Sequence, residues 1–108
     1  MAWHITYHHK AIGDMKKLGK TESLRVEKAI DKVAQNPLPH QEGGYGKPLG
    51  NTATSKLAGC MKIKLKNLGL RVVYQLIREA EAMKIVIISV RADDAVYKEA
   101  ERRLGGGE

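Results

Sequence analysis

Hydrophobic positions in the first third of the chain change their spacing twice, which separates three elements. Residues 3–7 are bulky and β-favouring, so they predict an opening strand. Over residues 8–18 apolar side chains recur every three positions among lysines, as they do on one face of a helix. A second helix is predicted from a cap at Thr21 to Asn36-Pro37, where proline ends it. We interpret the two helices as a hairpin.

The middle of the chain has a strand pattern instead. Residues 40–59 lack periodicity and contain many glycines, so we expect a long loop enclosing a short strand at 47–49. Residues 61–66 alternate apolar side chains with lysines, which is typical of a half-buried strand. A tight turn at 67–69 leads to a second strand over 70–77, and together they predict a β-hairpin.

The last third adds one strand and one helix. Residues 84–90 form a nearly continuous β-branched run, which is expected of a central strand covered on both faces. Asp93 or Asp94 can cap a final helix that ends in a run of glycines. The predicted order is β-α-α-β-β-β-α. The sequence therefore predicts an α+β fold over 1–108, a small single domain with an antiparallel sheet, an N-terminal helical hairpin and a C-terminal helix.

Composition narrows the class of protein. The 108 residues are 43% hydrophobic and 29% charged, which is typical of one soluble globular domain. A single cysteine excludes an intramolecular disulfide and a cysteine-rich zinc site. The longest apolar run, at 85–88, is far shorter than the ~20 residues that span a bilayer. The first residues lack the pattern of a signal peptide, so we expect a cytoplasmic protein without a membrane partner.

The charge of the chain is concentrated in one segment. Nineteen Lys and Arg against twelve Asp and Glu give a formal net charge of +7. Residues 43–78 contain no acidic residue, and the remainder of the chain is balanced, so this segment carries the whole excess. Its seven cations are Lys47, Lys56, Lys62, Lys64, Lys66, Arg71 and Arg78. Such segregation favours a binding surface for a polyanion.

The predicted β-hairpin gathers several of these cations. Alternation places Lys62, Lys64 and Lys66 on one side of their strand, and the turn brings Arg71 alongside. Lysines on an exposed strand are often only solvated, but like charges on neighbouring strands lower stability unless an anion lies between them. We therefore favour the interpretation that a phosphodiester backbone supplies that anion.

Cationic side chains can also cleave RNA. The reaction needs a base for the 2′-hydroxyl, stabilisation of the charged phosphate and a proton for the leaving oxygen. Neighbouring cations favour the neutral form of a lysine, and arginine forks onto phosphate oxygens. His4, His8 and His9 lack a fourth ligand at suitable spacing, so we expect surface histidines, with no metal and no cofactor.

Two runs of the sequence, residues 60–66 and 69–75, closely resemble the paired strands of RelE-type toxins in the RelE/ParE superfamily. Residues 88–90 and 95–100, with 102–104 behind them, are similar to the last strand and helix of the same family. The resemblance implies a RelE/ParE-like fold and a toxin of a type II toxin–antitoxin system. It also implies a metal-independent mRNA endonuclease that cuts the A-site codon on the ribosome by 2′-hydroxyl attack. The implied partners are a cognate antitoxin, the ribosome with its mRNA, and operator DNA through the antitoxin complex.

The resemblance also implies roles for individual residues. Lys62 and Lys64 match the two strand lysines of the family, with Lys64 the expected general base. Arg71 matches the arginine that stabilises the transition state, and Tyr97 matches the tyrosine that positions the substrate. Arg91, in the loop after the last strand, matches the family arginine that serves as phosphate clamp or as general acid. The other expected RNA contacts of the basic segment are Lys56, Lys66 and Arg78.

Two alternatives remain open at this point. A ParE-like toxin would share the fold but inhibit DNA gyrase without hydrolysis, although such chains generally lack the strand lysines and the last-helix tyrosine found here. A catalytically impaired member would bind only RNA or its antitoxin. That alternative rests on the loop 91–94, which is short and carries two acidic residues.

Overall fold

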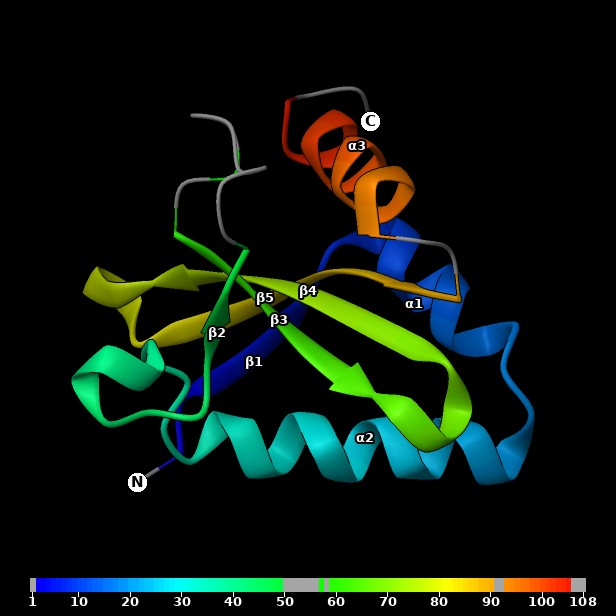
Figure 1. Ribbon diagram of the computed structural model, residues 1–108, viewed down its shortest axis with the longest axis horizontal. Helices are drawn as coiled ribbons and strands as arrows, with labels where there is room; N and C mark the ends of the chain where they lie inside the picture. Colours follow the sequence, from blue (N-terminus) through cyan, green and yellow to red (C-terminus); the bar gives the residue numbers. More distant parts are fainter. Residues whose placement is uncertain (1, 50–56, 58, 91–92, 106–108) are drawn as a thin grey trace.

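The computed structural model describes residues 2–49, 57, 59–90 and 93–105. In chain order the elements are β1 (His4–Tyr7), α1 (His9–Lys16), α2 (Lys20–Ala34), η1 (His40–Glu42), β2 (Lys47–Pro48), β3 (Cys60–Leu65), η4 (Lys66–Leu68), β4 (Leu70–Ile77), η5 (Arg78–Ala80), β5 (Ala82–Ser89) and α3 (Asp93–Leu104). Figure 1 shows α2 on one side of the sheet and α3 on the other. The predicted α+β class and element order are confirmed, with the short strand β2 included.

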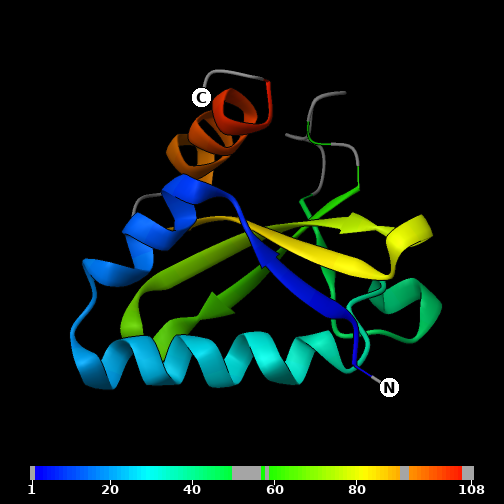
Figure 2. The ribbon, with the colours of Figure 1, turned by 180° about the vertical axis from the view of Figure 1, so that it is seen from behind.

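The five strands form a mixed sheet in the order β1-β5-β4-β3-β2. Strands β2 to β5 pair antiparallel, as predicted, but β1 runs parallel to β5. The prediction of a purely antiparallel sheet is therefore wrong at this edge, where Figure 2 shows β1 beside β5. The parallel register sets Ile5 and Tyr7 beside Met83 and Ile85, so all four add apolar surface to the same face. The strand pattern alone does not specify this long-range partner.

Both faces of the sheet are buried, and each face has its own core. On the α1–α2 side Val26 and Ile30 of α2 pack with Tyr74 and other side chains of β4 and β5. On the α3 side Val73 and Ile87 pack with Val96, Tyr97 and Ala100. Strand β5 contributes to both cores, which confirms the predicted doubly covered strand, although it begins at Ala82 and ends at Ser89.

The N-terminal helices begin at caps that differ from those predicted. Helix α2 starts at Lys20, so Gly19 is its N-cap, and the Gly19 N–H donates to the Glu22 carboxylate at 3.1 Å. The predicted cap at Thr21 is wrong for that reason. His8 caps α1, because its Nδ1 accepts from the Lys10 N–H at 3.1 Å. His8 is only 5% exposed, so the expected surface position is wrong for this histidine.

Two local features set the faces of the hairpin strands. Gly69 follows η4 with φ of 62°, and it closes the predicted turn between β3 and β4. The register between β4 and β5 shifts next to Val73, so that Val86 and Ile87 both face α3.

The two N-terminal helices lie on the opposite face, α1 against β5 and α2 against β3. In the described residues, no helix has the length and apolar character needed to cross a bilayer.

Candidate functional site

The cations of the β3–β4 hairpin form a row across the sheet. Lys64 lies directly opposite Arg71, and Arg71 lies opposite Ser89 of β5. Side chains of directly paired residues share a face, and their Cβ atoms are about 5 Å apart. Lys62 is on the same face, two residues from Lys64 and opposite Val73. The sequence prediction that the turn brings Arg71 alongside the strand lysines is thus confirmed.

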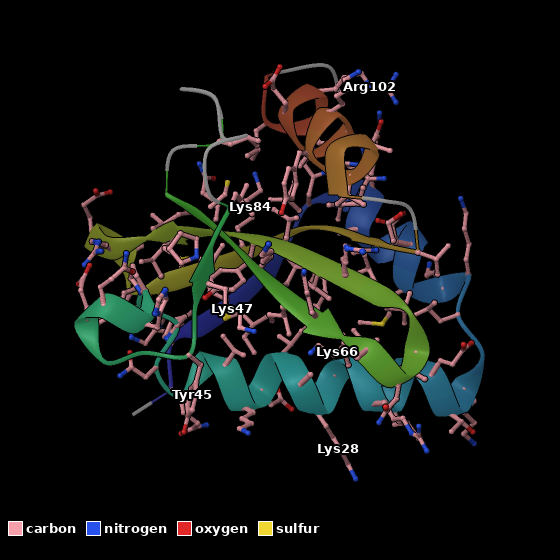
Figure 3. All side chains as sticks on the ribbon, in the orientation of Figure 1. Lys28, Tyr45, Lys47, Lys66, Lys84 and Arg102 are labelled. Carbon is pink, nitrogen blue, oxygen red and sulfur yellow. The ribbon has the colours of Figure 1, made fainter. Side chains whose placement is uncertain are left out.

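Two further lysines join this face of the sheet. Lys47 of β2, labelled in Figure 3, pairs with Lys62, so the two residues share one face of the sheet. Lys84 of β5 pairs with Gln75, which itself pairs with Cys60, so Lys84 also faces the α3 side. Sequence reasoning included Lys47 in the basic segment but did not place it beside Lys62, and it missed Lys84. It indicated a short strand at 47–49, but its partner and register depend on the folded loop.

Tyr97 of α3 packs against the same part of the sheet. The ring belongs to the core that contains Val73 and Ile87, and the residue is 5% exposed. Val73 pairs with Lys62 and lies two residues from Arg71, so the tyrosine lies next to the cationic row. Among the described residues, the buried hydroxyl of Tyr97 has no hydrogen-bond partner. A buried hydroxyl without a partner is costly in a folded protein, so its presence needs an explanation such as a catalytic role or an ordered water.

The structure does not bring every candidate to this row. Arg78 lies in η5, beyond the far end of β4, and forms a bidentate ion pair with Glu42 at 3.0 and 2.8 Å. Lys66 is exposed in η4, just past the end of β3. Arg91 and Lys56 lie outside the described residues. The row therefore consists of lysines from β2 and β3 and one arginine from β4.

A buried ion-pair network holds α3 over the sheet. Arg103 Nη1 donates to Asp14 Oδ2 of α1 at 2.7 Å and to the Val86 carbonyl at 2.8 Å, while its Nε donates to Glu99 at 3.0 Å. Burial alone would raise the pKa of Glu99, but the hydrogen bonds from Arg103 and Arg102 outweigh it and hold that pKa below 4.5. Sequence reasoning missed this network, although Arg103 continues the buried helical stripe of Val96 and Ala100.

Asp14 also closes the edge of β5. Strand β1 ends at Tyr7, opposite Ile85, so it leaves the following residues of β5 without a strand neighbour on that side. The Ile88 N–H donates instead to Asp14 Oδ2 at 3.0 Å. One carboxylate therefore connects α1, β5 and α3, which fixes the helix that carries Tyr97.

Other chemistry is poorly supported by the described residues. Within them, no three His, Cys, Asp or Glu side chains are grouped so that they could hold a metal ion. Cys60 is buried, and burial raises the pKa of its thiol to about 12, so it stays protonated and is a poor nucleophile. What the cationic row can do is bind a phosphodiester and stabilise additional negative charge on it.

Comparisons with known proteins agree with this arrangement. No protein-family model matches the chain. The mRNA interferase toxin RelE of Escherichia coli K12 is 29% identical over 104 residues, which cover 96% of this chain and 99% of the relative. A putative RelE-like toxin protein of E. coli is 28% identical over 107 residues, with the same coverage of both chains.

Solved structures show the same relationship in three dimensions. A double mutant of E. coli RelE in the free state matches with a TM-score of 0.76 and 28% identity, over 95% of this chain and 98% of that one. The toxin of the E. coli RelBE toxin–antitoxin complex matches with a TM-score of 0.65 and 25% identity, over 84% and 99%. In length, sequence and fold, this chain is similar to the RelE toxins.

Proposed function

We propose that this chain is the toxin of a type II toxin–antitoxin system and acts as an mRNA endonuclease. The observation that carries the proposal is the pairing of Lys64 with Arg71, beside Lys62 and Lys47, on the sheet face next to Tyr97. Relatives of nearly the same length are named mRNA interferases. A row of cations on a rigid hairpin is suited to hold one phosphodiester in a fixed orientation.

The chemistry assigns a different task to each side chain. Lys64 is the candidate base that removes the proton of the 2′-hydroxyl, because it lies directly opposite the arginine that fixes the phosphate. Arg71 stays protonated and stabilises the charge that develops on the phosphate oxygens. Lys62 supplies a second cation, and the hydroxyl of Tyr97 is positioned to donate a hydrogen bond to the substrate. Arg91 remains the candidate for the phosphate clamp or for the acid that protonates the leaving oxygen.

We further propose that cleavage depends on the ribosome and occurs in the A-site codon. The candidate site has no carboxylate among its described residues and no metal ligands, so it has little means of orienting a flexible RNA alone. A ribosome that holds the mRNA in line with its 2′-hydroxyl would supply that orientation. A cognate antitoxin is the expected protein partner, since E. coli RelE has been solved in complex with antitoxin RelB. Operator DNA would be contacted through that complex.

The test is cleavage of a programmed mRNA with and without ribosomes. The parent protein is expected to cut in the A-site codon only when ribosomes are present. Arg71→Ala is expected to abolish cutting, and Arg71→Lys to restore little of it, because a point charge cannot form the forked contact. If the folded parent protein cuts nothing under either condition, the nuclease proposal is wrong and a non-hydrolytic toxin, such as a gyrase inhibitor, replaces it.

A further inference from the structure

A second cationic feature lies around the edge of β3, between that strand and α2. We call it the edge groove, and its volume is about 520 Å³. Its polar lining consists of Arg25, Lys32, Tyr45, Lys47, Lys64, Lys66 and Asn67. Among the described residues, β2 pairs only with Met61 and Lys62, so the groove runs past the end of β2 along the rest of β3. Figure 3 shows Tyr45, Lys47 and Lys66 along this side of the molecule.

The floor of the edge groove is apolar. It is formed by side chains from α2, β3 and η4 that reach the groove between the cations: Ala29, Val33, Ile63, Leu65 and Leu68. In the part of the chain that the structure describes, no carboxylate lines the groove. An apolar floor with charged walls of one sign favours a ligand that carries both flat apolar groups and negative charges.

The charges of α2 are divided between two directions. Arg25 and Lys32 line the edge groove, seven residues apart and so on one face of the helix. Glu27 and Asp31 lie toward β1 instead. Burial raises the pKa of Tyr7 in that strand, and the negative charges of the two carboxylates raise it further. The edge groove therefore receives two cations and no acid from this helix, although Lys28 points elsewhere (Figure 3).

Tyr45 gives the groove a stacking surface. The residue is 52% exposed, and the Nζ of Lys32 lies 5.6 Å from the centre of its ring. The backbone around it is fixed, because the Tyr45 N–H donates to the Asn36 carbonyl and the Gly46 N–H to the Leu38 carbonyl, both at 2.9 Å. An exposed aromatic ring on a fixed backbone in a cationic groove is an arrangement on which unpaired bases stack, and Lys32 lies over this ring.

We propose that the edge groove binds single-stranded RNA next to the segment being cleaved. A base stacks on Tyr45, and Arg25 and Lys32 contact the neighbouring phosphates. The inference rests on the proposed function, because Lys64 and Lys47 belong both to the groove and to the catalytic side of the sheet. An RNA strand that leaves Lys64 can therefore follow a continuous path of cations around β3 to α2. An acidic peptide would match the charges but would have no equivalent use for the ring.

The experiment measures the affinity of a fluorescein-labelled, ten-nucleotide 2′-O-methyl RNA, which cannot attack itself, across a range of salt concentrations. Arg25→Gln/Lys32→Gln is expected to weaken binding and to make the slope of log K against log salt shallower by about 1.4, since each phosphate contact contributes about 0.7. Tyr45→Ala is expected to weaken binding roughly 5- to 100-fold with the slope unchanged, because stacking is not ionic. Lys28→Gln is the matched control, since Lys28 points away from the groove on the same helix (Figure 3).

Three results would overturn the proposal that the edge groove binds single-stranded RNA. In the first, Lys28→Gln lowers the slope as much as one groove cation does. In the second, Tyr45→Ala binds like the parent. In the third, a ten-residue polyglutamate displaces the RNA equally well from parent and Tyr45→Ala, which would identify an acidic-peptide site instead.

The ribosome assay separates this inference from the proposed function. If the parent cuts mRNA but groove variants bind RNA normally, only the groove is wrong. If the parent cuts nothing while the groove variants lose RNA affinity as expected, RNA binding in the edge groove is supported and only the nuclease proposal fails.

Discussion

Replacing Asp14 by alanine is expected to destabilise the protein and to loosen α3 from the sheet. The Asp14 carboxylate accepts hydrogen bonds from Arg103 and from the Ile88 N–H, and both side chains of the ion pair are mostly buried, at 9% and 13% exposed. Asp14→Ala removes all of these bonds at once. The Ile88 N–H then lacks its acceptor, and the buried Arg103 guanidinium keeps one carboxylate partner instead of two.

The magnitude follows from what Arg103 retains. Breaking a buried ion pair by removing one partner lowers stability by about 3–5 kcal/mol. Here Arg103 keeps its bonds to Glu99 and to the Val86 carbonyl, so we expect a value near the lower limit, about 3 kcal/mol. Against a total stability of roughly 5–15 kcal/mol for a small domain, this loss is readily measured.

The assay is urea unfolding of the parent, Asp14→Ala and Glu42→Ala. Glu42 is the matched control, because it forms the same bidentate pair with Arg78 but on the surface, with the two side chains 45% and 53% exposed. Glu42→Ala is expected to leave the urea midpoint almost unchanged, since exposed ion pairs contribute little. Equal shifts for the two variants would refute the argument that burial gives the Asp14 network its strength.

Two other variants test neighbouring parts of the site. Glu99→Gln is expected to flatten the acid limb of the stability profile. Against the effect of burial, the Arg103 and Arg102 hydrogen bonds lower the folded-state pKa of Glu99, so its contribution to the free energy of unfolding is present above the ordinary glutamate pKa and is lost as pH falls through the folded value. If the stability of the parent and of Glu99→Gln falls in parallel at acid pH in urea unfolding, this reasoning is wrong. Tyr97→Phe is expected to keep the urea midpoint but to slow cleavage, because the hydroxyl has no partner among the described residues. A large loss of stability, or parental cleavage, would show that the hydroxyl has only a structural role.

Much of the fold follows from local patterns. The alternation of lysines with Met61, Ile63 and Leu65 defined β3, and the strand predicted over 70–77 coincides with β4. What local patterns do not contain is the choice of a distant partner. The parallel pairing of β1 with β5 depends on the burial of Ile5 against a strand almost eighty residues later. The cap of α2 depends on a glycine whose N–H finds Glu22, where a hydroxyl side chain was expected.

The candidate site divides in the same way. Lys62, Lys64 and Arg71 could be placed together because a short turn connects their strands, so the hairpin fixes their register. Lys47 and Tyr45 reach β3 only through the folded loop after α2, and no periodic pattern records that approach. Arg78 shows the reverse case. It belongs to the basic segment in sequence, but the length of β4 carries it away from Arg71 to an acidic partner.

The most direct test of the central claim compares the cleavage rate and the ribosome affinity of Lys64→Ala with those of the parent. Lys84→Ala is the control, because Lys84 lies on the same sheet face but outside the row that pairs Lys64 with Arg71. If Lys64 removes the 2′-hydroxyl proton, its loss is expected to lower single-turnover cleavage on programmed ribosomes by about 100-fold or more, with affinity nearly unchanged. A parallel fall in cleavage and affinity would contradict the account and make Lys64 a phosphate contact only.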